Sequence, residues 1–61
     1  MGKIHVEHRI VVRDQNDRIV SDQPARSFVV ADPLYDTAVS KRLPGQTVTL
    51  QHGARIIRKS S

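Results

Sequence analysis

Residues 3–13 read Lys-Ile-His-Val-Glu-His-Arg-Ile-Val-Val-Arg, and this stretch decides the fold class. Apolar residues and one histidine take every second position, namely Ile4, Val6, His8, Ile10 and Val12. A side-chain period of two indicates a β-strand with one buried and one wet face, whereas an α-helix would scatter these residues around its circumference. We therefore predict a long strand over Lys3–Arg13.

A second strand is predicted to return from this one through a short hairpin. The turn formers Asp14–Asp17 can hydrogen-bond their own backbone, and Arg18–Ser21 then starts the return strand. Pro24 cannot donate to a ladder, so Asp22–Ala25 is expected to be a bulge or an interruption on a sheet edge. The extended run is expected to resume over Arg26–Ala31.

One helix and two more strands are predicted in the second half of the chain. Asp32 can cap a helix over Pro33–Arg42, since proline suits the first helical position, and Pro44-Gly45 would stop it. Alternation over Gln46–His52 predicts a third strand, and Ala54–Lys59 a fourth.

The order strand, strand, helix, strand, strand predicts one α+β domain over residues 1–61. Its four-stranded, mostly antiparallel sheet (β-β-α-β-β) would carry one short helix packed on one face. The alternative is a small all-β barrel in which residues 33–42 form only a turn. Tyr35 is expected to pack over Phe28 with its hydroxyl in water. The expected core on the helix side is Ile4, Val6, Ile10, Val12, Phe28, Val30, Leu34, Val39, Leu43, Val48, Leu50 and Ile56.

The chemistry-bearing residues do not predict an enzyme, a metal site or a cofactor. His5 and His8 are three apart and would point to opposite faces of a strand, so they cannot share an ion. The chain has no cysteine, no Gly-x-Ser-x-Gly elbow and no glycine-rich phosphate loop. A domain of 61 residues does not easily enclose a small-molecule pocket. We expect a non-catalytic binding module.

Basic residues are the main functional signal. Ten Lys and Arg against six acids give a net charge of +4. If the first and last strands are close, the basic residues would form one positive surface that binds the phosphates of nucleic acid without reading sequence. Its expected members are Lys3, Arg9, Arg13, Arg55 and Lys59 on one face, with Arg58 at the sheet edge.

The alternative function is a protein-interaction module or a homo-oligomer. The outer positions Val11, Val29 and Ile57, together with Ala31, would form an apolar patch with a basic rim, as protein interfaces have. A small aliphatic core also favours association. An accessory or inhibitor protein of phage or mobile-element type, docked on a larger complex, would fit this description. No apolar run is long enough to span a bilayer, so we expect a cytoplasmic protein with no membrane partner.

Overall fold

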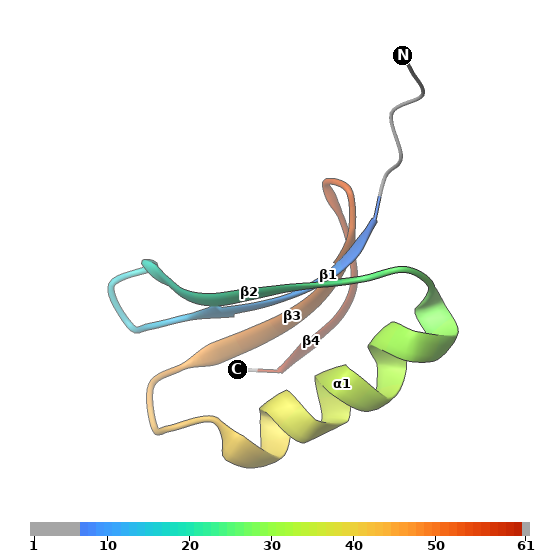
Figure 1. Ribbon diagram of the computed structural model, residues 1–61. Coiled ribbons are helices and arrows are strands. Elements are labelled where there is room, and N and C mark those ends of the chain that lie inside the picture. Colours follow the sequence, from blue (N-terminus) through green and yellow to red (C-terminus); the bar gives the residue numbers. More distant parts are fainter. Residues whose placement is uncertain (1–6, 61) are drawn as a thin grey trace.

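The computed structural model describes residues 7–60, which form four strands and one helix (Figure 1). In chain order these are β1 (His8–Arg13), β2 (Ile19–Ala25), α1 (Phe28–Lys41), β3 (Thr47–His52) and β4 (Arg55–Ser60). The strands form one sheet in the order β2-β1-β3-β4, with every neighbouring pair antiparallel.

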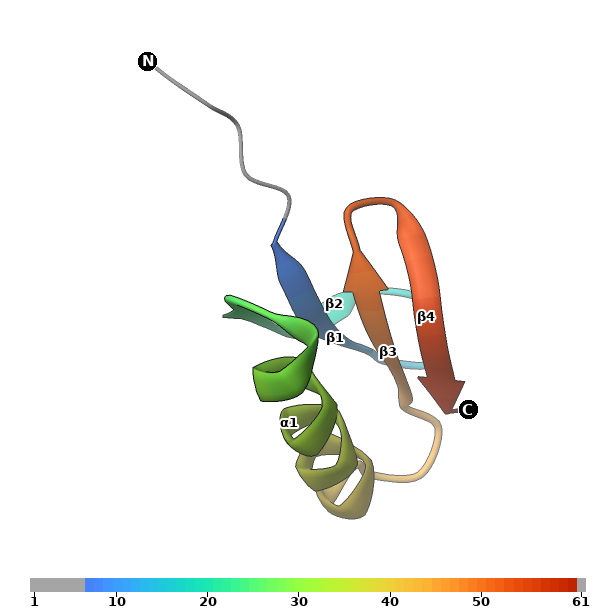
Figure 2. The same ribbon diagram turned by 90° about the vertical axis from the view of Figure 1, so that its right-hand side faces the viewer.

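The predicted α+β fold is confirmed. Helix α1 covers one face of the sheet, and in Figure 2 no other described helix or strand covers the opposite face. We call this opposite face the outer face. The barrel alternative is wrong, because β2 and β4 end the sheet as open edges. Residues 1–6, which include Lys3, Ile4 and Val6 of the predicted strand, lie outside the described residues.

The β1–β2 hairpin turns at Asp14–Asp17, as predicted. The Asp14 carboxylate accepts hydrogen bonds from the Asn16 and Arg18 amides at 2.8 and 3.0 Å, and Asp17 adopts a φ of 64°. Strand β2 is not interrupted at Pro24, which pairs with Arg9. Because β2 is an edge strand of the described sheet, no neighbouring strand lies on its free side. The missing N–H of Pro24 therefore removes no interstrand hydrogen bond there.

Helix α1 begins one turn before the predicted start, so the predicted strand over residues 26–31 is wrong. Ser27 is the N-cap, and its hydroxyl accepts a hydrogen bond from the Val30 amide at 3.3 Å. Pro33 lies inside the helix and not at its first position. A proline there removes a bond to the Val29 carbonyl. Val29 is 80% exposed, so water can hydrate this end of the helix.

The helix ends at Lys41, close to the predicted position. The Gln46 side-chain oxygen accepts from the Leu43 amide at 3.0 Å, and the Arg42 guanidinium donates to the Gln46 carbonyl at 3.0 Å. Gly45 has a φ of 87°, a conformation that residues with a Cβ rarely adopt. The loop after α1 is therefore fixed by its own hydrogen bonds.

The core lies between α1 and the central strands β1 and β3. The predicted core residues Ile10, Val48 and Leu50 are buried, and Val12, Leu34 and Val39 pack partly buried against them. Ala25, Ala31 and Tyr35 complete the core, although the sequence did not predict them there. The predicted core residues that are in fact exposed are Phe28, Val30, Leu43 and Ile56.

The earlier helix start explains most of these differences. In a helix, Ala31 and Tyr35 lie four residues apart and face the sheet together, whereas Val30 lies off that face and is exposed. Phe28, in the first turn, meets the His8 ring and is 43% exposed. Tyr35 is only 4% exposed and belongs to the core, where the sequence did not place it. The Arg58 guanidinium lies over the Tyr35 ring, 4.5 Å from its centre.

Candidate binding surfaces

The outer face carries the first part of the predicted basic set. Ile10 faces α1, so its neighbours Arg9 and Val11 point to the outer face, and Arg13 follows at the same parity. Across β3 these positions pair with Gln51, Thr49 and Thr47. The register therefore places Arg9 and Arg13 on one face, as the sequence predicted.

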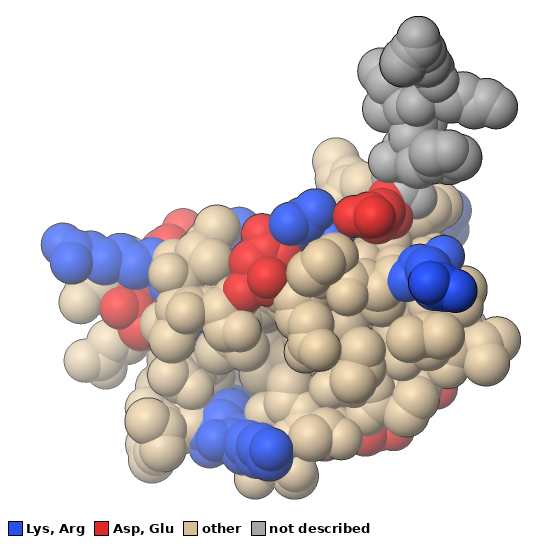
Figure 3. All heavy atoms as spheres, in the orientation of Figure 1, with Lys and Arg blue, Asp and Glu red and all other residues tan. Residues whose placement is uncertain are grey.

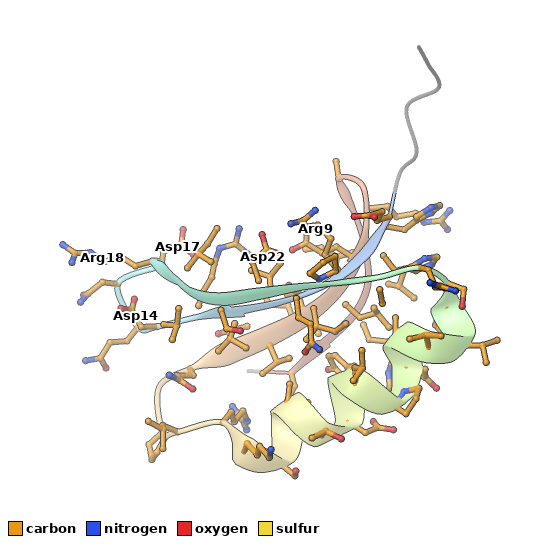
Figure 4. The ribbon with its side chains drawn as sticks, in the orientation of Figure 1. Arg9, Asp14, Asp17, Arg18 and Asp22 are labelled. Carbon is orange, nitrogen blue, oxygen red and sulfur yellow. The ribbon has the colours of Figure 1, made fainter. Side chains whose placement is uncertain are left out.

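Arg9 is neutralised by acids on that face. Its guanidinium donates to the Asp22 carboxylate on β2 at 2.8 Å, and Glu7 lies 3.9 Å away. Figure 4 shows Arg9 and Asp22 on the same side of the sheet, pointing away from α1. The hydrogen bond and the charge of Asp22 raise the pKa of Arg9, which therefore stays charged and paired.

Arg13 lies beside a hollow of about 270 Å³ that also contains acids. Asp17 is 3.6 Å from the Arg13 guanidinium, and Asp14 lines the same hollow with Lys59. Two carboxylates beside two cations offset the attraction for a phosphate. The hollow is a mixed-charge surface.

A bulge in β4 separates Arg55 from Lys59, which the sequence placed on one face. The register shifts between Leu50 and Gln51, so Lys59 pairs with Thr49 on the outer face while Arg55 pairs with His52. His52 pairs with His8 on the side that meets α1. The prediction that Arg55 and Lys59 share a face is wrong, because strand alternation does not continue through the extra residue of a bulge.

Arg58 lies on the helix side and is fully engaged there. Its guanidinium is 2.6 Å from the Asp32 carboxylate and 3.3 Å from that of Asp36, and it covers the Tyr35 ring. The hydrogen bond to Asp32 raises the pKa of Arg58, burial opposes this rise, and the charges of Asp32 and Asp36 add to it. The predicted phosphate contact is thus a link between β4 and α1.

The predicted apolar interface is not one patch. Val11 is only 4% exposed, because it lies on a central strand between the long side chains of Arg9 and Arg13. Val29 lies on α1 and not on the sheet, and so does the buried Ala31. Ile57 is 40% exposed in the β4 bulge. The premise that these residues share a sheet face is wrong.

The histidines meet in an arrangement that the sequence did not predict. His8 and His52 are directly paired, and their rings stack with centres 4.3 Å apart and planes 9° from parallel. The Phe28 and His8 rings meet edge to face, with their centres 6.1 Å apart. No group of three or more His, Cys, Asp or Glu that could hold a metal ion lies within residues 7–60.

A groove with a largely apolar lining lies between the edge strand β2 and helix α1. Its volume is about 290 Å³, close to the lower limit of ligand pockets at roughly 300 Å³. Helix α1 packs mainly over β1 and β3, so its flank and the β2 edge stay apart. We call this the β2–α1 groove; its lining is Val12, Val20, Ser21, Gln23, Leu34, Thr37, Ala38, Lys41, Arg42 and Gln46.

The β2–α1 groove has an apolar middle and a basic end. Val12, Val20, Leu34 and Ala38 supply apolar surface, and no Asp or Glu is among the lining residues. Lys41 at the end of α1 makes no ion pair within residues 7–60. Figure 3 shows this face of the molecule, with uncharged surface between β2 and α1 and basic side chains towards its rim.

The sequence could not predict the groove, because its walls come from three elements and its residues look ordinary in each. Val20 reads as a strand former, and Leu34 and Ala38 as part of a helix stripe.

Comparison with protein-family models, with curated proteins and with solved structures found no match. Among residues 7–60, no helix has the length and apolar character needed to cross a membrane.

Proposed function

We propose that this protein is a small non-catalytic binding module that holds an extended segment of a partner protein in the β2–α1 groove. The observation that carries this proposal is the position of the groove beside a free sheet edge. Among the described strands β2 pairs with β1 alone, and Ile19–Pro24 are all exposed. Half of the backbone donors and acceptors of an edge strand point away from the sheet.

In strand addition, a partner segment uses both the free edge of β2 and the neighbouring groove. An extended segment can pair with the free edge of β2 through its backbone, while alternate side chains enter the neighbouring groove. Pro24 has no N–H to donate, so the segment would pair with the first part of β2, over Ile19–Gln23. These residues lie beside the apolar part of the groove, whose lining includes Val20, Ser21 and Gln23.

A non-catalytic role fits the polar groups of the described residues. Within residues 7–60, no buried side-chain nitrogen or oxygen lacks a hydrogen-bond partner. Active sites commonly keep such groups for substrate. Here the polar side chains serve the hairpin, the helix ends and the ion pairs described above.

Nucleic-acid contact remains the alternative, and the charge arrangement favours it less. Arg9, Arg13 and Arg58 are paired with acids, and Arg55 and Lys59 lie on different sides of the sheet. If phosphate contacts nevertheless dominate, the affinity for duplex DNA falls with salt by about 0.9 log units per log unit of salt for each neutralised phosphate. A mobility shift with that salt dependence, abolished by reversing the charges of Arg55 and Lys59, would support this alternative.

A peptide-display selection tests the proposed function. The full chain selects from a library of random octapeptides, with Val20→Arg as the groove variant and Val29→Arg as the matched control. Both valines are exposed, at 56% and 80%, and both changes add one positive charge. Only Val20 lines the groove.

We expect Val20→Arg to weaken the selected peptides about tenfold or more, since it fills the centre of the contact. Val29→Arg should leave their affinity within about twofold, as exposed positions outside a contact usually do. Failure to enrich any peptide, or peptides that bind Val20→Arg as well as the unchanged chain, would overturn the proposal.

A further inference from the structure

We infer that the β2–α1 groove recognises the free C-terminal carboxylate of its partner segment, which adds to β2 as an antiparallel strand. This inference rests on the proposed function and names the chemistry of the partner. It is carried by the charge at one end of the groove and by the direction of the elements that form the walls.

The cations of the groove are concentrated at its end. Lys41 is the last residue of α1 and Arg42 follows it, and both line the groove. Arg42 donates to the Gln46 carbonyl and forms no ion pair within residues 7–60. A guanidinium has five N–H donors, so donors remain for a carboxylate.

The acids of the described residues do not compensate these cations. Asp22 and Glu7 lie beside Arg9 on the outer face, and Asp17 lies beside Arg13. Asp14 accepts hydrogen bonds from the Asn16 and Arg18 amides in the hairpin turn, and Asp32 and Asp36 bind Arg58 on the side of α1 towards β4. The basic end of the groove therefore attracts an anion that residues 7–60 do not supply.

The direction of β2 brings a C-terminus to this end. β2 runs towards the start of α1, and α1 runs back, so Lys41 lies near the beginning of β2 (Figure 1). A segment antiparallel to β2 runs from the Pro24 end towards Ile19 and finishes beside Lys41. A parallel segment would start there instead, and its terminal ammonium would meet two cations.

The same charges disfavour a second copy of this chain as the occupant. The side of β2 towards the groove offers Val20, Ser21 and Gln23, with no acid among them. Asp22 points to the outer face, where it pairs with Arg9. Antiparallel pairing with β2 of another copy would bring the Pro24–Ala25 end of that strand beside Lys41, and neither residue carries a carboxylate.

Two random libraries separate this inference from the proposed function. In one library the octapeptides end in a free carboxylate, and in the other the same octapeptides are fused by their C-termini to a carrier. We expect groove-dependent binders from the first library only. Binders lost in Val20→Arg but obtained equally from the carrier-fused library would keep the proposed function and overturn the carboxylate inference. No binders from either library would overturn both.

A charge test follows on the strongest free-carboxylate peptide. We expect conversion of its carboxylate to the amide to weaken binding about fivefold, the size of a partly exposed ion pair. In Lys41→Ala the difference between the acid and amide forms should shrink, because only Arg42 remains at that end of the groove, and Lys41→Arg should restore it. Lys59→Ala removes the same charge on the outer face and should leave the difference unchanged.

Three results would overturn the inference. The first is equal binding of acid and amide by the unchanged chain. The second is an amidated peptide that regains tight binding when a Glu is placed within its sequence, because the cations would then recognise side-chain carboxylates. The third is a concentration-dependent dimer in sedimentation that the free-carboxylate peptide does not dissociate, which would assign the groove to a second copy.

Discussion

Arg58 joins the edge strand β4 to helix α1 through three different contacts. Its guanidinium meets the carboxylates of Asp32 and Asp36 and covers the Tyr35 ring, whose other side is buried in the core. A cation over a tyrosine face adds to the ion pairs, and the stem of the arginine covers apolar surface. The raised pKa keeps Arg58 charged, so this stabilisation persists until the pH rises above the usual range of arginine.

Arg58→Met tests the importance of this link. Methionine keeps an unbranched stem but removes the charge, so we expect the melting temperature to fall by several degrees. Lys59→Met is the control, since Lys59 makes no ion pair within residues 7–60. Equal melting temperatures for the two variants would show that the contacts of Arg58 contribute nothing beyond those of an ordinary surface cation.

The ion pair between Asp32 and Arg58 could not be predicted from the sequence around either residue alone. Asp32 reads as a helix cap and Arg58 as a phosphate contact. The cap prediction is wrong, because the helix starts earlier, at Phe28, and Asp32 then lies on its side facing β4, where it pairs with Arg58. The charge of each residue was evident, but its partner depended on where another element begins.

Helix α1 depends on a cap that follows a strand-like stretch. Phe28, Val29 and Val30 favour strands, and the sequence predicts an extended run there. The Ser27 hydroxyl satisfies the Val30 amide, and the burial of Ala31 and Tyr35 on one helix face stabilises the helical alternative. Tertiary packing therefore overrides local propensity in this turn.

Ser27→Ala tests this explanation of the helix start. We expect a loss of about 1 kcal/mol of unfolding free energy, typical of removing a serine cap. Carbon chemical shifts should lose helical character over residues 28–31 first. Ser40→Ala, in the last part of the same helix, should be neutral, since alanine is the better helix former. An unchanged free energy in Ser27→Ala would mean that another group determines the helix start.

The whole molecule has a small core on one side of its sheet and an outer face of alternating charge. Period-two alternation correctly predicted Ile10, Val48 and Leu50 in the core, because β1 and β3 are central and regular, but it did not predict the burial of Val11 and Thr49 on the outer face. It failed at β4, where a bulge reverses the parity, and in the predicted strand that became helix. The candidate groove needed the packing of three elements, which no single segment encodes.

Substitutions of two leucines distinguish the described core from the predicted core. Leu50 is fully buried, whereas Leu43, which the sequence also predicts in the core, is 63% exposed. Leu50→Ala should cost about 2–5 kcal/mol, enough to unfold much of so small a domain. Leu43→Ala should change the unfolding free energy by less than about 0.5 kcal/mol. Denaturant unfolding that gives equal losses for the two variants would contradict the described core.

The most direct test of strand addition to β2 is a titration of the full chain with the strongest selected peptide. The amide NMR chemical shifts are recorded at each step. We predict that the largest changes fall on residues 19–23 of β2 and on the flank of α1 from Leu34 to Lys41. We also predict slower hydrogen exchange for those β2 amides that point away from β1. Changes centred on Arg9, Arg13 and Lys59 of the outer face, with β2 exchange unaltered, would contradict the β2–α1 groove as the binding site.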